Sequence, residues 1–200
     1  MYNIRYGLNY LRHRFRANNR HGIHSPFVYK LIDMVIYDYR DQKVYRGIEE
    51  VFHKQHSDKH MIKSMPLKVY KLIYRLVVYF KPTTVFFADH EDCITPSIVG
   101  NAIPTAEIID VKYPAQARQA DMIFVDTARH DATECLEKVM PNIDHDTVLI
   151  FSGIHRTQNI KQAWERVKID NRVRVTIDLF YIGLVFFKPG MSKEDFKVRY

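Results

Sequence analysis

The sequence predicts an α/β domain with a mostly parallel, doubly wound sheet. From about residue 82 onward, short runs of β-branched and aromatic residues alternate with helical segments, which is typical of parallel sheets. Residues 85–87 and 148–151 are apolar throughout, as expected for strands covered on both faces. The last two runs are separated only by Phe180 and Tyr181. This link is too short for a crossover and predicts an antiparallel hairpin.

The first 80 residues predict helices. Four apolar residues recur at helical spacing and predict an amphipathic helix that buries one stripe: Ile4, Leu8, Leu11 and Phe15. Ser25 and Pro26 fit the cap and first position of a second helix, which runs to about residue 39. A short helix around residues 48–52 and a stronger one over 64–80 follow. We expect residues 1–80 to be a helical extension packed on residues 81–200, forming one compact domain.

The remaining elements follow from the same patterns. Strands are predicted at residues 84–88, 107–111, 122–126, 147–151, 173–179 and 182–187. Helices are predicted at residues 96–102, 132–140 and 158–168.

Composition excludes several classes of protein. The 200 residues are 46% hydrophobic and 26% charged, which is globular rather than disordered. No apolar run approaches the roughly 20 residues of a membrane span, and no signal peptide begins the chain. We therefore expect a cytoplasmic protein without a membrane partner. The net charge of +7 comes mainly from an acid-free arm over residues 1–32. A nucleic-acid contact through this arm stays open; it would use Arg12, Arg14, Arg16 and Arg20.

Three segments carry a resemblance to a known family. They are HGIHSPFV at residues 21–28, IFSGIH at 150–155 with Ala163-Trp164 after it, and TIDLF at 176–180 with GLVFF at 183–187. In this order they resemble a family of bacterial proteins similar to class I S-adenosylmethionine (SAM) methyltransferases, related in fold to metal-dependent O-methyltransferases. The resemblance implies a Rossmann-like methyltransferase fold and a SAM site at the strand ends.

The cofactor loop departs from that family. There the first strand ends in an acid and a glycine-containing turn that approaches the cofactor. Residues 87–95 (FADHEDCIT) contain no glycine, and their carboxylates would crowd the cofactor's own carboxylate. We therefore expect a degenerate member that binds no cofactor. If SAM binds, the resemblance implies that Ala88, Asp89 and Asp110 line it.

The second strand departs as well. The family's ribose-binding acid corresponds to Val111, and Asp110, one residue earlier, would point to the opposite face of the strand. Only residues 112–121 then precede the next strand, fewer than the dozen or so that a parallel crossover needs. One helix–strand unit is therefore expected to be missing, and with it one wall of the adenine pocket.

The family's metal site is incomplete in this chain. Asp126 matches the first metal-binding acid and His130 a following histidine, but Ser152-Gly153 replaces the second acidic pair. One carboxylate is too few for Mg²⁺, so we expect no metal. As a residual pocket, Asp126 or His130 would act as a base, with Ser152 and His155 near the substrate. The alternative is that these residues only cap helices and satisfy the loop backbone.

Three functions therefore stay open. The first is a methyltransferase-fold protein that is catalytically impaired, a pseudoenzyme acting as a binding module. The second is an active SAM-dependent methyltransferase that modifies an oxygen or nitrogen of a small molecule. The third is a protein that contacts nucleic acid or another anionic ligand through its arm. A homodimer is compatible with each.

Overall fold

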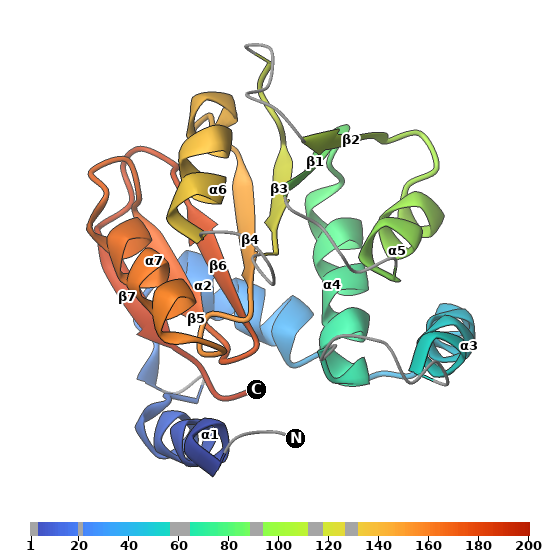
Figure 1. Cartoon of the computed structure of the whole chain (residues 1–200), viewed down its shortest axis with the longest axis horizontal. Helices are drawn as coiled ribbons and strands as arrows, with labels where there is room; N and C mark the ends of the chain where they lie inside the picture. Colours follow the sequence, from blue (N-terminus) through green and yellow to red (C-terminus); the bar gives the residue numbers. More distant parts are fainter. Residues whose placement is uncertain (1–3, 20–21, 57–64, 89–93, 112–117, 127–131) are drawn as a thin grey trace.

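The computed structural model describes residues 4–19, 22–56, 65–88, 94–111, 118–126 and 132–200. They form a seven-stranded sheet in the order β2-β1-β3-β4-β6-β5-β7, with helices on both faces (Figure 1). The strands are β1 (Thr84–Ala88), β2 (Glu107–Val111), β3 (Met122–Val125), β4 (Val148–Ser152), β5 (Val175–Asp178), β6 (Ile182–Phe186) and β7 (Glu194–Lys197). The helices are α1 (Ile4–Arg16), α2 (Pro26–Leu31), the π-helix η2 (Ile32–Ile36), α3 (Val44–His56), α4 (Leu67–Phe80), α5 (Ile94–Ala102), α6 (Ala132–Val139), the short 3₁₀ helix η3 (Met140–Asn142) and α7 (Gln158–Ile169).

Strand pairing confirms the predicted sheet. β2, β1, β3 and β4 pair in parallel, and β6 runs antiparallel between β4 and β5. The predicted strand 173–179 shortens at both ends to β5; at its carboxyl end Phe180 has a φ of 72° and the chain turns. β7 was not predicted; it pairs in parallel with β5 along an exposed edge.

β2 forms the other edge of the sheet described by the structure. Glu107, Ile108 and Asp110 are exposed, and Val111 is buried opposite Ala88. Within the described residues no further strand pairs with β2, in keeping with the expected loss of one helix–strand unit.

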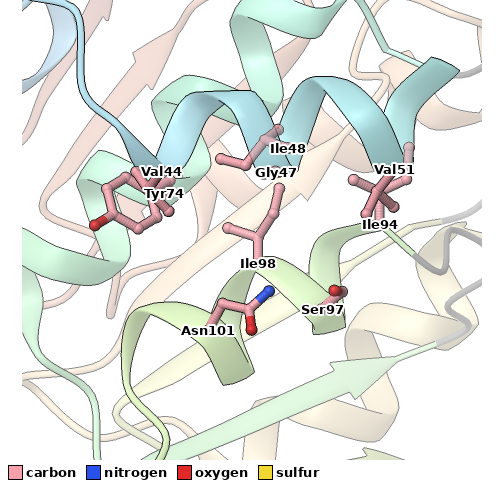
Figure 2. A pocket seen from close by; sticks show the side chains of 9 residues that line it. All are labelled: Val44, Gly47, Ile48, Val51, Tyr74, Ile94, Ser97, Ile98 and Asn101. Carbon is pink, nitrogen blue, oxygen red and sulfur yellow. The ribbon is translucent and has the colours of Figure 1, made fainter.

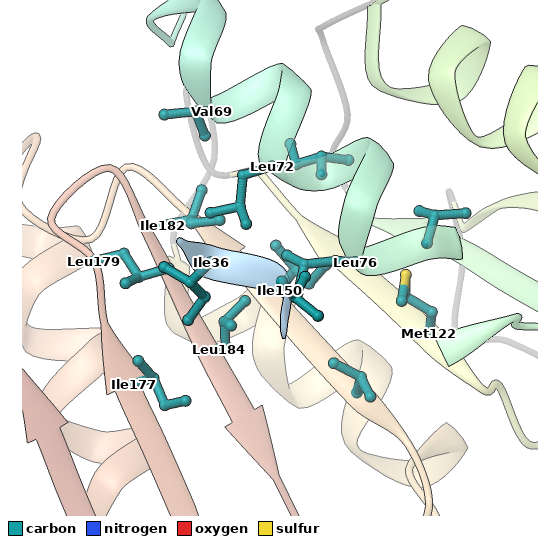
Figure 3. Close-up of a cluster of buried hydrophobic side chains, with 14 of the residues drawn as sticks. Ile36, Val69, Leu72, Leu76, Met122, Ile150, Ile177, Leu179, Ile182 and Leu184 are labelled. Carbon is teal, nitrogen blue, oxygen red and sulfur yellow. The ribbon is translucent and has the colours of Figure 1, made fainter. Parts of the chain in front are cut away.

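Strand alternation divides the core into two clusters. Val85 and Phe87 of β1 face the cluster that α2, η2, α4 and α5 cover, whereas Phe86 and Ala88 face the cluster under α6 and α7. Figure 3 shows part of the first cluster, with aliphatic side chains from α4, η2 and the strands packed together. Two apolar layers explain why the central strands are apolar throughout.

The N-terminal helices form where the sequence predicts, but several of their ends differ. The helix predicted to run to about residue 39 ends at Ile36, and the short helix predicted around residues 48–52 is the longer α3. Ser25 caps α2 by accepting a hydrogen bond from the backbone N–H of Val28, with Pro26 in the first helical position. The helix continues to residue 36 as η2. The buried Arg75 of α4 then donates to the backbone oxygens of Val35 (2.7 Å) and Ile36 (3.3 Å) and satisfies the end of η2.

The orientation predicted for α1 is wrong. Ile4, Leu8, Leu11 and Phe15 face outward and are 82%, 50%, 50% and 85% exposed. The inward face instead carries Tyr6, Tyr10 and His13, of which His13 is buried. The physical reason is that aromatic and imidazole groups complement the polar end of the sheet, which an aliphatic stripe would leave without hydrogen bonds.

Candidate functional site

The carboxyl ends of β1, β3, β4 and β5 lie along one edge of the sheet, because these strands run in the same direction. Open α/β sheets bind ligands at this edge. Ala88 and Asp126 are neighbours there: the backbone N–H of Asp126 donates to the Ala88 oxygen (3.2 Å). Both residues are buried.

The other predicted site residues are only partly brought together. Ser152 ends β4 and is buried, and His155 lies three residues beyond it. Asp110 lies on the edge strand β2, opposite Phe87, and its side chain is exposed. Because β1 separates β2 from β3, Asp110 is not brought next to Asp126. Asp89 and His130 lie outside the described residues.

Arg156 follows β4 and brings its guanidinium to Asp126 at the end of β3. Gly153 has a φ of +68° and donates its N–H to the Tyr181 oxygen (2.7 Å); its own oxygen accepts from Arg156 N–H (2.7 Å). This tight turn returns the Arg156 side chain over Gly153, where an added Cβ would lie 3.1 Å from Nε. The Nη1 atom of Arg156 is 3.7 Å from Oδ1 of Asp126. Asp126, for which the sequence resemblance implied a metal-binding role, therefore pairs with a cation of the chain itself.

A second charged group joins α1 to the sheet. The Nε2 atoms of His13 and His155 lie 2.9 Å from Oδ1 and Oδ2 of Asp178, respectively. The Phe180 backbone N–H also donates to Oδ1 (2.9 Å). Burial raises the pKa of the Asp178 carboxyl, but the hydrogen bonds from His13 and His155 outweigh it and hold that pKa well below its usual value. We call His13, His155 and Asp178 the clamp.

Phe180 packs the clamp from one side. Its ring stacks on His155 at 5.0 Å and makes edge contacts with His13 (5.5 Å) and Tyr10 (5.0 Å). The positive φ of a non-glycine residue costs about 1–3 kcal/mol, and it persists where surrounding contacts fix it. Here the bond to Asp178 and these ring contacts supply that constraint.

The clamp has a donor set that a transition metal could use. The two imidazole nitrogens and one carboxylate oxygen lie within 4.8 Å of one another. Two histidines and one carboxylate can hold a divalent ion with open positions. In this structure, however, the clamp atoms form hydrogen bonds with each other, so the clamp already joins α1 to β5 without an ion.

The Mg²⁺ site of metal-dependent relatives does not fit these residues. Ser152-Gly153 supplies no carboxylate, and the Arg156 guanidinium faces Asp126. A second cation would have to displace Arg156 and find other oxygen ligands.

Sequence reasoning missed His13, Arg156, Asp178 and Phe180. His13 and Asp178 are 165 residues apart, and the histidine was obscured by the aliphatic stripe beside it. Arg156 had a local signal, since a glycine that allows positive φ precedes it by three residues after an apolar strand.

A small, mostly apolar cavity lies between helices α3 and α5. It is enclosed by α3, α5 and Tyr74 of α4, and Figure 2 shows Ile48, Ile94 and Ile98 pointing into it. Its volume of about 70 Å³ is far below the roughly 300–1,000 Å³ of small-molecule sites. It therefore fits a packing defect better than a cofactor pocket.

Comparisons with solved structures identify the fold. The SAH-bound methyltransferase PaMTH1 of Podospora anserina has a TM-score of 0.57 at 8% identity, covering 83% of this chain and 97% of that one. The O-methyltransferase TomG of Streptomyces achromogenes, in complex with SAM, has a TM-score of 0.51 at 11% identity, covering 78% and 95%. A methyltransferase from Geobacter sulfurreducens has a TM-score of 0.53 at 11% identity, covering 82% and 98%.

No family model and no curated protein matches the sequence. Among the described residues, no helix is long and apolar enough to cross a membrane. The strand order, the C-terminal antiparallel hairpin and these structural similarities together show that the chain has the fold of class I SAM-dependent O-methyltransferases.

Proposed function

We propose that this chain is a methyltransferase-fold protein that has lost methyl transfer from SAM and acts as a binding module. The observation that carries the proposal is the Asp126–Arg156 pair beside Ser152-Gly153. Fold alone does not decide activity, so the proposal depends on these residues and their geometry.

Charge at the strand ends supports this reading. The side chains of Asp126 and Arg156 are only 11% and 21% exposed. In such a partly buried site, replacing the arginine by Mg²⁺ would require moving a guanidinium into water and ordering new oxygen ligands. The chain thus provides a positive charge for Asp126 without an exchangeable ion.

The clamp, at the end of β5, also supports the proposal. α1 is held across the end of β5 by His13, and Phe180 fills the space between α1 and His155. His155, which the sequence suggested as a substrate-pocket residue, is committed to Asp178 and is mostly buried. An acceptor would therefore have to displace packed groups to reach it.

Calorimetric titration with SAM and with SAH tests the proposal directly. We expect no binding heat for either ligand, whereas a SAM-dependent O-methyltransferase titrated in the same buffer should bind. Thermal unfolding in millimolar Mg²⁺ should also leave the melting temperature unchanged. Micromolar binding of either ligand, or a clear Mg²⁺-dependent shift, would overturn the proposal.

The active-enzyme alternative rests on the adjacency of Ala88 and Asp126 at the ends of β1 and β3. In that case SAH would bind, Ala88, Asp89 and Asp110 would line it, and Asp126 or His130 would activate a small acceptor. Asp126→Asn would then abolish methyl transfer while leaving SAH affinity nearly unchanged. The same titration therefore separates the two functions.

A further inference from the structure

Helix α1 presents opposite faces to the domain and to solvent. Tyr6 and Tyr10 contact the Phe180 ring at 5.0 Å each, and His13 joins Asp178. Just beyond the helix, the Asn18 N–H donates to the Lys197 oxygen (2.8 Å), and its oxygen accepts from the Arg199 N–H (3.1 Å). The helix is therefore fixed in orientation at its inner face and at its end.

The opposite face is a narrow apolar stripe. At about 100° per residue, Ile4, Leu8, Leu11 and Phe15 fall within an arc of roughly 60°. Ile4 and Phe15 are more than four-fifths exposed, and Leu8 and Leu11 are half-exposed. A stripe held outward in this way is more than the scattered exposed apolar residues of an ordinary surface.

Cations border the stripe on both sides. On a helical wheel Arg5, Arg12 and Arg16 lie along one side and Arg14 along the other. All four side chains are exposed, and α1 contains no acidic residue. An apolar stripe with three arginines along one side and one along the other matches a helix that lies in the plane of an anionic lipid surface.

Against the expectation from composition that the protein has no membrane partner, we propose that α1 docks this protein on the surface of a membrane containing anionic lipids. The four apolar side chains would enter the acyl boundary, while the arginines reach outward to lipid phosphates. With 13 residues, α1 is too short to span a bilayer, so the docking is peripheral. Because the clamp already orders the helix, less conformational entropy is lost on binding than for a disordered arm.

The charge of α1 and its apolar stripe favour a lipid surface over two other partners, a second copy of the chain and a nucleic acid. A second copy that packed its own α1 on the stripe would bring the arginines of the two helices together, with no acid in either helix to pair with them. A nucleic acid would engage the arginines but would leave Ile4, Leu8 and Leu11 without an apolar partner. Of these three occupants, the anionic lipid surface alone satisfies both the stripe and its borders.

The test is co-sedimentation of the full chain with phosphatidylcholine vesicles, with and without about one-third phosphatidylserine. We expect preferential binding to the phosphatidylserine vesicles, weakened by salt. Replacing both Leu11 and Phe15 by Gln should reduce partitioning at least tenfold. Replacing Arg12, Arg14 and Arg16 by Gln should remove the preference for phosphatidylserine.

Ile169 provides the matched control, because it is 78% exposed at the end of α7, on another element. Ile169→Gln should leave vesicle binding unchanged, and circular dichroism should show all variants folded. Equal sedimentation with both vesicle types, or unchanged binding of the Leu11/Phe15 variant, would overturn the proposal. The proposal would also be overturned if vesicle binding is absent and the same substitutions abolish either a dimer seen in sedimentation equilibrium or binding to duplex DNA. None of these measurements involves SAM, so failure here leaves the proposed loss of catalysis unaffected.

Discussion

Replacing Asp178 by Asn keeps the shape of the side chain and removes the charge at the centre of the clamp. In the native chain one carboxylate accepts from two imidazoles and from the Phe180 N–H, all at 2.9 Å. An Asn oxygen can still accept from one or two of these donors. The NH₂ group of the Asn side chain then faces the remaining imidazole, and it cannot accept a hydrogen bond from the imidazole N–H.

The expected cost follows from the number of bonds lost. A hydrogen bond to a charged group contributes about 1.5–3 kcal/mol, and leaving a buried donor or acceptor without its partner costs about 1–3 kcal/mol. Asp178 is 7% exposed, so water cannot replace the lost contacts easily. We expect Asp178→Asn to lower the free energy of unfolding by about 2–5 kcal/mol. For a chain of this size the melting temperature should fall by about 5–15 °C.

The assay is urea unfolding at several pH values, with Asp146→Asn as control. Asp146 is 71% exposed and only 3.5 Å from Lys188, so its replacement should change stability by less than about 0.5 kcal/mol. The depressed pKa of Asp178 adds a pH signature. Its stabilisation is present above the unfolded pKa of about 3.9 and is lost as pH falls below it, so wild type and variant should converge in acid. A difference below about 0.5 kcal/mol at pH 7 would refute the clamp.

Two further predictions concern packing and a half-buried phenol. In Gly183→Ala the new Cβ would lie 2.5 Å from two carbons of the Trp164 ring. Urea unfolding should therefore show a free energy of unfolding lower by about 3 kcal/mol. As a control, the Cβ of Gly47→Ala in α3 meets open space, so this variant should be neutral or slightly stabilised. Burial raises the pKa of Tyr200 to about 12, outweighing the neighbouring Arg75, which lowers it. Stability should therefore fall as pH rises from about 10 toward 12, and thermal unfolding of Tyr200→Phe should lack that part of the decline.

The sheet could be predicted because its signals are local. Apolar runs such as residues 148–151 reveal strands buried on two faces, and the short link at Phe180-Tyr181 forces an antiparallel hairpin. β7 escaped prediction because Glu194 and Asp195 give it the composition of a loop. It is a strand only because β5 offers it a free edge.

The site could be predicted only where it follows a strand. Asp126 and Ser152 were placed at the sheet edge because each ends an apolar run. The clamp joins α1 to β5 across most of the chain, and no local pattern links His13 with Asp178. The orientation of α1 was predicted wrongly for a related reason. An aliphatic stripe normally marks the buried face of a helix, but the end of a sheet is polar and selects groups that can form hydrogen bonds.

The two faces of α1 give one more prediction, which compares adjacent residues. Tyr10 touches the rings of Phe180 (5.0 Å) and Tyr181 (5.9 Å), and aromatic pairs contribute about 0.5–1.5 kcal/mol each beyond burial. Tyr10→Ala should therefore weaken the packing of α1 on the sheet by about 2 kcal/mol. Leu11→Ala, on the outer face of the helix, should weaken this packing by less than about 0.5 kcal/mol. Because α1 is near the end of the chain, it can undock while the sheet stays folded, so hydrogen exchange of its backbone amides is the measurement. Faster exchange in Leu11→Ala than in Tyr10→Ala would mean that the aliphatic stripe, and not the aromatic face, holds the helix to the domain.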